Sequence, residues 1–206
     1  MMRLAVFASG GGSNFQALLD RKNSGDLHVD FCLLIVNNSN AGAAQRAQRA
    51  GIPVEHCAPS HFPTEEAYVA ALQGLLIRYG VDFIALAGYM KKLPRAIVAS
   101  YRERIVNIHP GLLPAFGGKG MYGLNVHRAV LDYGAKVSGI TVHFIDEEYD
   151  RGPIILQQAV PVLDNDTVET LASRVLAAEH DNFWRAIEAF SRGTLRVEGR
   201  RVVGEI

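Results

Sequence analysis

Short apolar runs alternate with amphipathic segments along the first half of the chain, and this alternation constrains the fold more than any other feature. Apolar runs of this length, bounded by glycine, proline or asparagine, are typical of buried strands. They occupy residues 3–8, 29–36 and 81–87, and a short further strand is expected at 54–56. Strands that alternate with helices form right-handed units around a parallel sheet. The pattern predicts an α/β fold, a Rossmann-like open sheet whose parallel N-terminal half has helices on both faces.

The second half of the chain departs from this alternation and predicts antiparallel strands toward the C-terminus. The expected elements are a strand at 105–109, a helix at 125–133, strands at 137–145 and 154–162, a long helix ending at Gly193, and a hairpin at 195–203. The acidic connection 146–152 is too short for a crossover, so the strands that it joins are expected to form an antiparallel pair or a sharp corner.

Three local signals place helix ends. Ser13 or Asn14 can cap the first helix, and Pro63 is expected to open a later one. Asp166 and Glu169 resemble the capping box of the long last helix.

Length and composition indicate one compact domain over residues 1–206. The chain of 206 residues is 49% hydrophobic and 20% charged, which suffices for one sizeable core. Its 21 basic and 21 acidic residues cancel, which argues against nucleic acid and membrane surfaces as partners. The N-terminal apolar run is too brief for a signal peptide, and the 2 cysteines show no disulfide framework. We therefore expect a cytoplasmic protein.

A glycine loop connects the first strand to the first helix. Its sequence is Ser9-Gly10-Gly11-Gly12-Ser13-Asn14. A strand, a glycine loop and a helix in succession present backbone N–H groups and a helix N-terminus to an anion. Three successive glycines exceed what a turn requires, which favours a phosphate site at this loop, where Ser13 or Asn14 could also donate to the phosphate, over a tight turn with a good cap.

The features missing from this loop narrow the kind of phosphate compound. The dinucleotide fingerprint needs a third glycine where Phe15 stands, and the second strand ends in Asn37 instead of an acidic residue for a ribose diol. NAD is therefore disfavoured.

A nucleoside triphosphate is disfavoured by a second segment. The only Gly-Lys pair in the chain, Gly118-Lys119, is followed by Gly120, where a nucleoside-triphosphate loop has serine or threonine. A single phosphate, as in a sugar phosphate or a mononucleotide, fits better.

Asn107 and His109 fall on one face at the carboxyl end of the fifth strand, where open α/β sheets bind ligands. With Asp150 they offer an amide for a developing oxyanion, an imidazole that titrates near neutrality, and a carboxylate that can fix or charge that imidazole. No nucleophile elbow is present. These residues predict direct transfer of an acyl-type group to an amine. The alternative is structural, with Asp150 beginning a turn with Arg151 and Gly152.

Other polar residues carry weaker signals. His56, Cys57 and His61 are of the residue types that bind metals. Their spacing matches no standard metal site and no fourth ligand is nearby, so no metal is expected. His143 lies within a strand, where a hydrogen-bonded core histidine is the commoner case, and a supporting role at the site stays open. Glu179 and His180 allow either a ligand contact or a solvated helix face, and His127 is expected at the surface.

Several motifs occur in combination over nearly the full length. They are Ser9 to Asn14, Asn107-Ile108-His109-Pro110, Leu113-Pro114-Ala115-Phe116-Gly117-Gly118, Gly139-Ile140-Thr141-Val142-His143-Phe144, Asp150-Arg151-Gly152-Pro153-Ile154-Ile155-Leu156-Gln157 and Ala178-Glu179-His180. This series resembles that of the formyltetrahydrofolate-using formyltransferases.

The resemblance implies an activity and its partners. N10-formyltetrahydrofolate would be the co-substrate, and its formyl group would pass to the amine of glycinamide ribonucleotide in de novo purine biosynthesis, without metal or NAD. The substrates would be small molecules, and the chain would act as a monomer or a homodimer. The domain would divide into a phosphate-binding half, 1–100, and a catalytic and folate-binding half, 101–206.

The resemblance also implies a role for particular residues. The catalytic residues would be Asn107, His109 and Asp150, with His143 behind them. The substrate phosphate would bind at Gly12, Ser13 and Asn14, and the rest of glycinamide ribonucleotide would face Glu179. The folate would be bordered by Met90, Lys91, Lys92, Leu93, Asn107, Asp146, Glu147, Glu148, Tyr149 and Asp150.

Two departures and three alternatives accompany this reading. Glu65 stands where some relatives have an arginine near the folate tail, and the segment 117–123 is longer than in many relatives. A formyltetrahydrofolate deformylase usually has an extra N-terminal domain, for which this chain leaves no length. A methionyl-tRNA formyltransferase would need a further domain and a basic surface. A non-catalytic nucleotide-phosphate binding module is the alternative outside enzymes.

Overall fold

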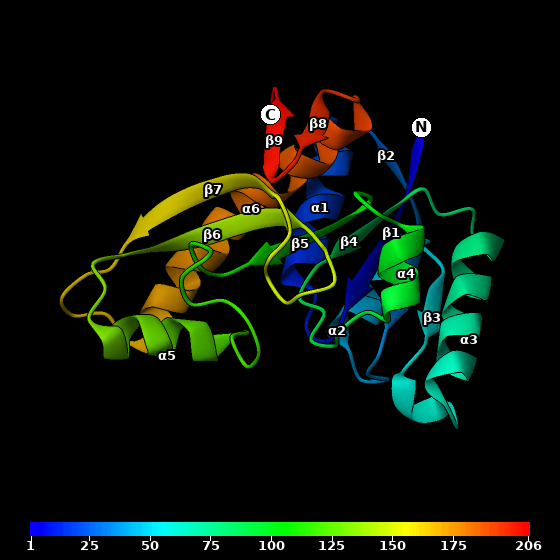
Figure 1. Ribbon diagram of the computed structural model, residues 1–206, viewed down its shortest axis with the longest axis horizontal. Helices are drawn as coiled ribbons and strands as arrows, with labels where there is room; N and C mark the ends of the chain where they lie inside the picture. Colours follow the sequence, from blue (N-terminus) through cyan, green and yellow to red (C-terminus); the bar gives the residue numbers. More distant parts are fainter. The chain divides into compact units, whose positions relative to one another are not determined.

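The computed structural model describes residues 1–206 and contains nine strands and six α-helices (Figure 1). These residues cluster into two compact units, Met1–Val106 and Asn107–Ile206. The boundary falls inside β5 (Ile105–His109). No helix is long and apolar enough to cross a lipid bilayer.

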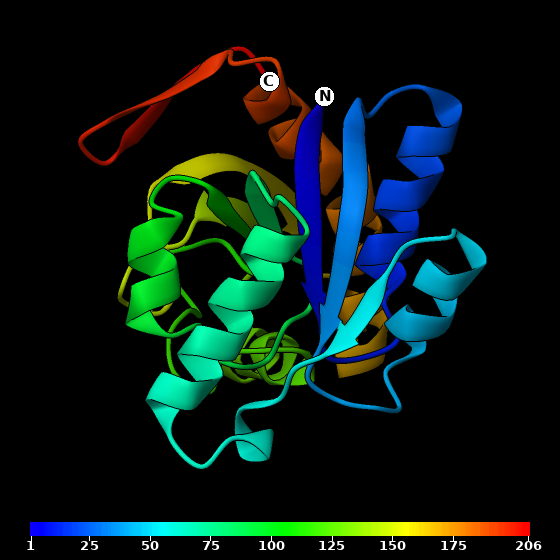
Figure 2. The same cartoon turned by 90° about the vertical axis from the view of Figure 1, so that its right-hand side faces the viewer.

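The first unit is built on four parallel strands in the order β3-β2-β1-β4. The strands are β1 (Met2–Ala8), β2 (Val29–Val36), β3 (Val54–His56) and β4 (Phe83–Leu86). The helices are α1 (Ser13–Ser24), α2 (Gly42–Arg49), α3 (Glu65–Arg78) and α4 (Arg95–Ser100), with a 3-10 turn η1 (Pro59–His61). Helices α1 and α2 lie on one face of the strands, and α3 and α4 lie on the other (Figure 2). The predicted parallel α/β arrangement is confirmed.

The core of this unit follows the central strands. Residues 4–8 of β1 and 33–35 of β2 are fully shielded from solvent. Strands covered by helices on both faces are apolar along their whole length, which is why these runs do not alternate with polar residues. On α3 the buried residues are Tyr68, Leu72 and Leu76. Each fully buried side chain of this size stabilises the fold by about 1.5–3 kcal/mol.

Two helices of this unit differ from the expectations. Helix α3 begins at Glu65 instead of Pro63, because the Thr64 side chain caps it by accepting a hydrogen bond from the Ala67 N–H at 3.2 Å. Helix α4 was not predicted. Its 6 residues are too few to show a helical period, and it has no side-chain cap.

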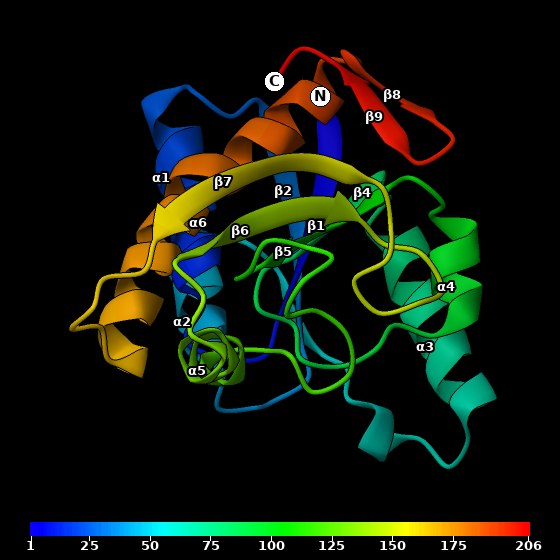
Figure 3. The ribbon, with the colours of Figure 1, turned by 60° about the vertical axis from the view of Figure 1, so that its left-hand side comes forward.

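The second unit contains the antiparallel strands. Its elements are α5 (Leu124–Tyr133), β6 (Val137–Phe144), β7 (Ile154–Pro161), α6 (Val168–Ser191), β8 (Leu195–Glu198) and β9 (Arg201–Gly204). Strands β6 and β7 pair antiparallel and run side by side, with α6 packed against both (Figure 3). Strands β8 and β9 form the predicted hairpin, which joins β7 through the single parallel bridge between Ile154 and Arg201. The predicted antiparallel pairings are confirmed.

Helix α6 starts one residue later than the expected capping box implies. The box is formed by Thr167, whose side chain accepts from the Thr170 N–H, while the Thr170 side chain accepts from the Thr167 N–H. Asp166 has a different role, because both of its carboxylate oxygens accept hydrogen bonds from Arg174, at 2.7 and 2.8 Å. This guanidinium holds the pKa of Asp166 well below its usual range.

Candidate active site

The end of β5 and the end of β6 place two polar side chains against each other. The Asn107 amide nitrogen lies 3.2 Å from Nε2 of His143, which is fully buried. The other ring nitrogen of His143, Nδ1, lies 2.8 Å from the Phe144 carbonyl oxygen. A carbonyl only accepts, so Nδ1 carries the hydrogen and Nε2 of the neutral ring accepts from Asn107. His143 thereby fixes the orientation of the Asn107 amide.

Strand irregularity helps to aim His143. The register between β6 and β7 shifts between Val142 and His143, because Val142 pairs with Leu156 and His143 with Ile154. Bulges of this kind are frequent beside active sites, where they redirect a side chain.

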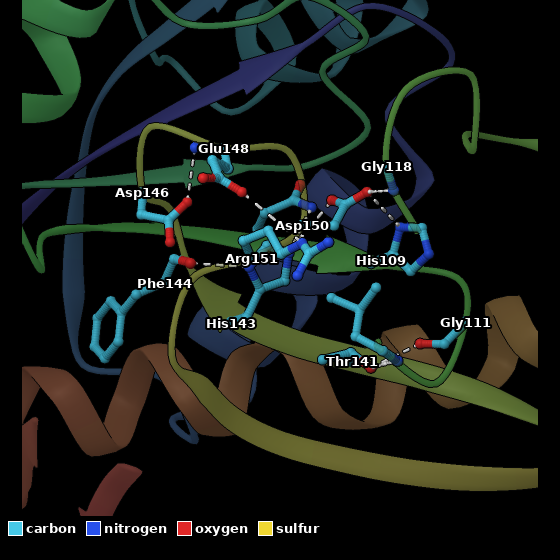
Figure 4. A network of polar contacts seen from close by, with 12 residues as sticks. His109, Gly111, Gly118, Thr141, His143, Phe144, Asp146, Glu148, Asp150 and Arg151 are labelled. Atoms are coloured by element: carbon cyan, nitrogen blue, oxygen red, sulfur yellow. Dashed lines mark hydrogen bonds and ion pairs between the residues drawn. The ribbon is translucent and has the colours of Figure 1, made fainter. Parts of the chain in front are cut away.

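Asp150 brings a carboxylate to both histidines. One carboxylate oxygen, Oδ2, lies 3.8 Å from Nδ1 of His109, and the other, Oδ1, lies 3.7 Å from Nε2 of His143. Figure 4 shows the Asp150 carboxylate beside the two imidazoles, with the Gly118 N–H donating to Oδ2 at 2.7 Å. The Asp150 side chain is only 12% exposed. Asn107, His109, His143 and Asp150 therefore form one cluster within the second unit.

The segment between β5 and α5 closes on His109 through its backbone. Nε2 of His109 donates to the Phe116 carbonyl oxygen at 2.9 Å. Phe116 and Asp150 have positive φ angles of 51° and 54°, which non-glycine residues rarely adopt. Strained backbone of this kind clusters at functional sites, where the surrounding structure holds it. Here both strained residues present an oxygen to the same imidazole.

Burial decides the charge of the two rings. It lowers the pKa of His109 below its ordinary value of 6.5, although the Asp150 carboxylate and the Phe116 carbonyl favour the charged ring. Burial also lowers the pKa of His143, although the Phe144 carbonyl and the Asp150 carboxylate favour the charged ring. Both rings are therefore neutral at pH 7. Of the two roles open to the carboxylate, charging the ring is therefore not favoured, and the Phe116 carbonyl, which accepts from Nε2–H, orients His109.

Thr141 supports the site from β6 and was not singled out from the sequence. Its fully buried hydroxyl donates to the Gly111 carbonyl at 2.7 Å and accepts from the Leu113 N–H at 3.0 Å and from the Gln157 amide at 3.0 Å. Figure 4 shows Thr141 beside Gly111. This hydroxyl thus ties the chain just beyond His109 to β6. The sequence signal that could have found it is a hydroxyl placed between Ile140 and Val142 in β6.

His127 lies in the interior and not at the surface as expected. Its side chain on α5 is 4% exposed, and its Nδ1 atom has no hydrogen-bond partner. Burial lowers the pKa of His127, and His109 lowers it further. The expectation was wrong because His127 lies with Val126 and Val130 on the buried face of α5.

The glycine loop of the first unit has the geometry of an anion site. Gly12 is the N-cap residue of α1 in a left-handed conformation, with φ 73°, and no side chain caps this helix. Ser13 and Asn14 are therefore the first residues of α1 and not its cap. A helix start without a side-chain cap leaves backbone N–H groups for a ligand. Ser9 ties the loop to the chain after β4, because its hydroxyl accepts from the Met90 N–H at 2.8 Å.

The remaining predicted residues differ in exposure. Leu93 is 4% exposed and Met90 54%, while Lys91 and Lys92 are exposed. In the acidic connection, Asp146 accepts from the Glu148 N–H at 2.9 Å, which shapes the turn that leads to Asp150. Glu147, Glu148 and Tyr149 are exposed. On α6, Glu179 is 6% exposed and is therefore not part of a solvated face.

No group of three or more histidine, cysteine, aspartate or glutamate side chains is arranged to hold a metal ion. His56 and His61 pack edge to face, with ring centroids 4.5 Å apart, and Cys57 is buried.

Comparison with known proteins places this site in a family. The sequence pattern of the formyl transferases matches residues 2–187. The chain belongs to the formyl transferase family. The matched residues include both the glycine loop and the four-residue cluster.

Individual relatives agree with the family. A protein of Vigna unguiculata named phosphoribosylglycinamide formyltransferase, chloroplastic, is 47% identical over 187 residues, which are 91% of this chain and 60% of the relative. The chain thus spans less than two thirds of that protein. The crystal structure of glycinamide ribonucleotide transformylase 1 from Symbiobacterium toebii has a TM-score of 0.93 and 44% identity, and the match covers 100% of this chain and 95% of that one. A formyltetrahydrofolate deformylase from Pseudomonas syringae has a TM-score of 0.89 and 26% identity, covering 100% of this chain and 66% of that one.

Proposed function

We propose that the protein transfers the formyl group of N10-formyltetrahydrofolate to the amine of glycinamide ribonucleotide. The single observation that carries the proposal is the cluster in which an amide, two neutral imidazoles and a carboxylate meet within hydrogen-bonding or near-contact distance. These are the groups that direct acyl transfer to an amine requires, and the cluster contains no serine or cysteine nucleophile. The names of the Vigna and Symbiobacterium relatives support the choice of acceptor.

The proposed reaction begins with attack of the amine nitrogen on the formyl carbon. The carbonyl π bond opens and its electron pair becomes an oxyanion. Asn107 donates to this oxygen through the amide hydrogen that His143 does not engage, because His143 holds the other one. His109 donates through Nε2–H, with the formyl oxygen taking the place of the Phe116 carbonyl as acceptor. An oxyanion donor of this kind typically contributes a factor of about 100 to 1,000 in turnover.

The proton balance is completed by Asp150. The attacking amine must lose one proton, and N10 of the folate must gain one as its bond to the formyl carbon breaks. We assign to Asp150 the transfer of this proton, directly or through one water. The Gly118 N–H keeps one carboxylate oxygen oriented during the transfer. General acid and base catalysis by a positioned group contributes about 100-fold to 10,000-fold.

We assign the substrate-binding residues as the resemblance to the formyltransferases implies. We assign the phosphate to Gly12, Ser13 and Asn14, and the amine-bearing part of the ribonucleotide to Glu179. The folate would contact residues 90–93 and 146–150, in which the exposed side chains are those of Met90, Lys91, Lys92, Glu147, Glu148 and Tyr149. Holding two reactants in reactive geometry converts an encounter into an internal step and supplies much of the rate.

Water as the acceptor is the second candidate function, and the similarity to the Pseudomonas syringae deformylase favours it. The two functions differ only in what attacks the formyl carbon. The deciding experiment follows loss of the formyl group from N10-formyltetrahydrofolate with glycinamide ribonucleotide present and then with water alone. Rapid turnover only with the ribonucleotide supports the first function. Equal rates in both assays would replace it with the second.

Two expectations stay predictions. They are the cytoplasmic location and the monomeric or homodimeric state. The Vigna relative is named as a chloroplast protein, so location has to be measured in the organism that makes this chain. Sedimentation at several protein concentrations would give the oligomeric state.

A further inference from the structure

We propose that Arg46 is a positioning residue of the glycine loop. It holds the Gly11 carbonyl turned toward α2, so that the N–H groups of the loop face the substrate phosphate. The inference rests on the proposed function, because it assigns a role within the phosphate site of that function.

The carbonyl groups of the three glycines all have partners inside the first unit. The Gly10 carbonyl accepts from the Ala43 N–H at 3.2 Å, and the Gly12 carbonyl accepts from the Gln16 N–H at 2.9 Å. The Gly11 carbonyl accepts from Nε of Arg46 at 2.8 Å. Two of the three donors come from α2, and Arg46 is the only side chain among them. The partial negative charges of the loop are thereby directed away from any bound anion.

The loop and the first turn of α2 approach each other backbone to backbone. A Cβ added at Gly12 would lie 2.7 Å from Cβ of Ala43, and one added at Gly42 would lie 3.2 Å from the Gly11 oxygen. The side chain of a helical residue lies over the turn before its own Cα. Arg46, one turn after Gly42, is therefore placed to reach back to the loop.

The guanidinium of Arg46 is itself held in place. Its Nη1 donates to the Gln16 side-chain oxygen at 3.0 Å, and the Gln16 amide nitrogen donates to Asp20 at 2.9 Å. The chain from Arg46 through Gln16 to Asp20 links α2 with the first turns of α1. Arg46 is half-buried, and its bond to Gln16 is partly shielded from water.

A loop of consecutive glycines needs such a constraint. Glycine populates backbone conformations that other residues avoid, so the peptide between Gly11 and Gly12 can turn over at little steric cost. Turned over, it would present a carbonyl oxygen to the phosphate instead of an N–H group. The bond from Arg46 selects the anion-binding orientation before the ligand arrives.

The test compares Arg46→Met with Arg49→Met. Arg49 lies on the same helix, is exposed, and its Nε donates within the helix, to the Gln45 carbonyl at 3.3 Å. We expect Arg46→Met to raise KM for glycinamide ribonucleotide and the inhibition constant of inorganic phosphate about tenfold each, the effect of losing one hydrogen bond to a charged group. The KM for N10-formyltetrahydrofolate and kcat at saturation should stay within about twofold, and Arg49→Met should resemble the wild type in all four constants.

Two further variants separate positioning from charge. Arg46→Lys keeps the charge but lacks the planar fork that serves both Gly11 and Gln16, so it should recover only part of the loss. Gln16→Met removes the acceptor that holds the guanidinium while Arg46 remains, and it should raise the phosphate inhibition constant as well. Full recovery by Arg46→Lys, or an equal loss in Arg49→Met, would show a general charge effect and overturn the inference.

The outcome can be told apart from failure of the proposed function. If the wild type does not formylate glycinamide ribonucleotide, the proposed function fails. Calorimetric titration with inorganic phosphate still tests Arg46 in that case. Equal phosphate affinity in the wild type and in a folded Arg46→Met, or in Gln16→Met should Arg46→Met not fold, would refute the role of Arg46.

Discussion

Gly152→Ala is expected to damage catalysis without touching a catalytic side chain. A Cβ at residue 152 would overlap the Phe144 carbonyl oxygen and would lie 3.3 Å from the Asp146 nitrogen. Phe144 cannot give way easily. Its ring is buried, its N–H donates to the Pro153 carbonyl, and its own carbonyl accepts from His143. The connection that carries Asp150 must therefore move.

The expected size of the effect follows from the displacement. Restoring an ordinary contact requires a shift of roughly 1 Å or more, and a misplacement of that size typically costs about 100-fold in rate. Asp150 lies two residues before Gly152 and shares this shift. We expect kcat to fall about 100-fold, and the added methyl to cost about 1–3 kcal/mol of stability by overpacking.

The assay is steady-state formyl transfer together with thermal unfolding of the same samples. Gly74→Ala is the matched control, because a Cβ at this position on α3 meets nothing within 4 Å. It should keep full activity and gain up to about 1 kcal/mol of stability from helix propensity. A folded Gly152→Ala with the kcat of the wild type would refute the claim that this close approach positions Asp150.

Three further predictions concern the same unit. Asn107→Ala and His109→Ala should each lower kcat about 100-fold to 1,000-fold with a smaller change in substrate dissociation constants, and near-normal turnover in single-turnover assays would contradict their assignment. Thr141→Val should cost about 1–3 kcal/mol in urea unfolding, because it leaves buried backbone groups unpaired, whereas Thr141→Ser should lose less. The free energy of unfolding should fall as pH drops below 6.5, since burial lowers the pKa of His109, His127 and His143 in the folded state and the unfolded chain binds protons first. Each ring changes the free energy of unfolding by at most about 1.4 kcal/mol per pH unit. His127→Asn should make this pH dependence weaker below pH 6.5 and leave it unchanged above pH 7.5.

Much of the fold could be predicted because its signals are local. The strands β1 and β2 are continuous apolar runs, and the bounds expected for β2 agree with those observed. Helix ends were less predictable, since several residues near each end are able to cap. At the start of α6, Asp166 has the sequence pattern of a cap, but its bond to Arg174 leaves the cap to Thr167. Which residue caps α6 therefore depends on Arg174, about two helical turns further along the chain.

The candidate site could be predicted only as far as its side chains. Asn107, His109 and Asp150 carry chemistry that is visible in the sequence, and they do meet in the second unit. The Phe116 carbonyl and the Gly118 N–H are backbone groups, so the identity of the residue does not indicate that they take part in the site. The charge of His109 could not be predicted either, because it is set by burial, which depends on how the segment after β5 folds over the ring.

The four residues that would handle the formyl carbon all come from Asn107–Ile206, whereas the glycine loop belongs to Met1–Val106. The phosphate contacts of the recipient can therefore change through mutations in one stretch of the gene while the reactive machinery in the other is preserved. Because the amine-bearing part of the recipient is assigned to Glu179 in Asn107–Ile206, a full change of recipient is expected to need substitutions in both stretches.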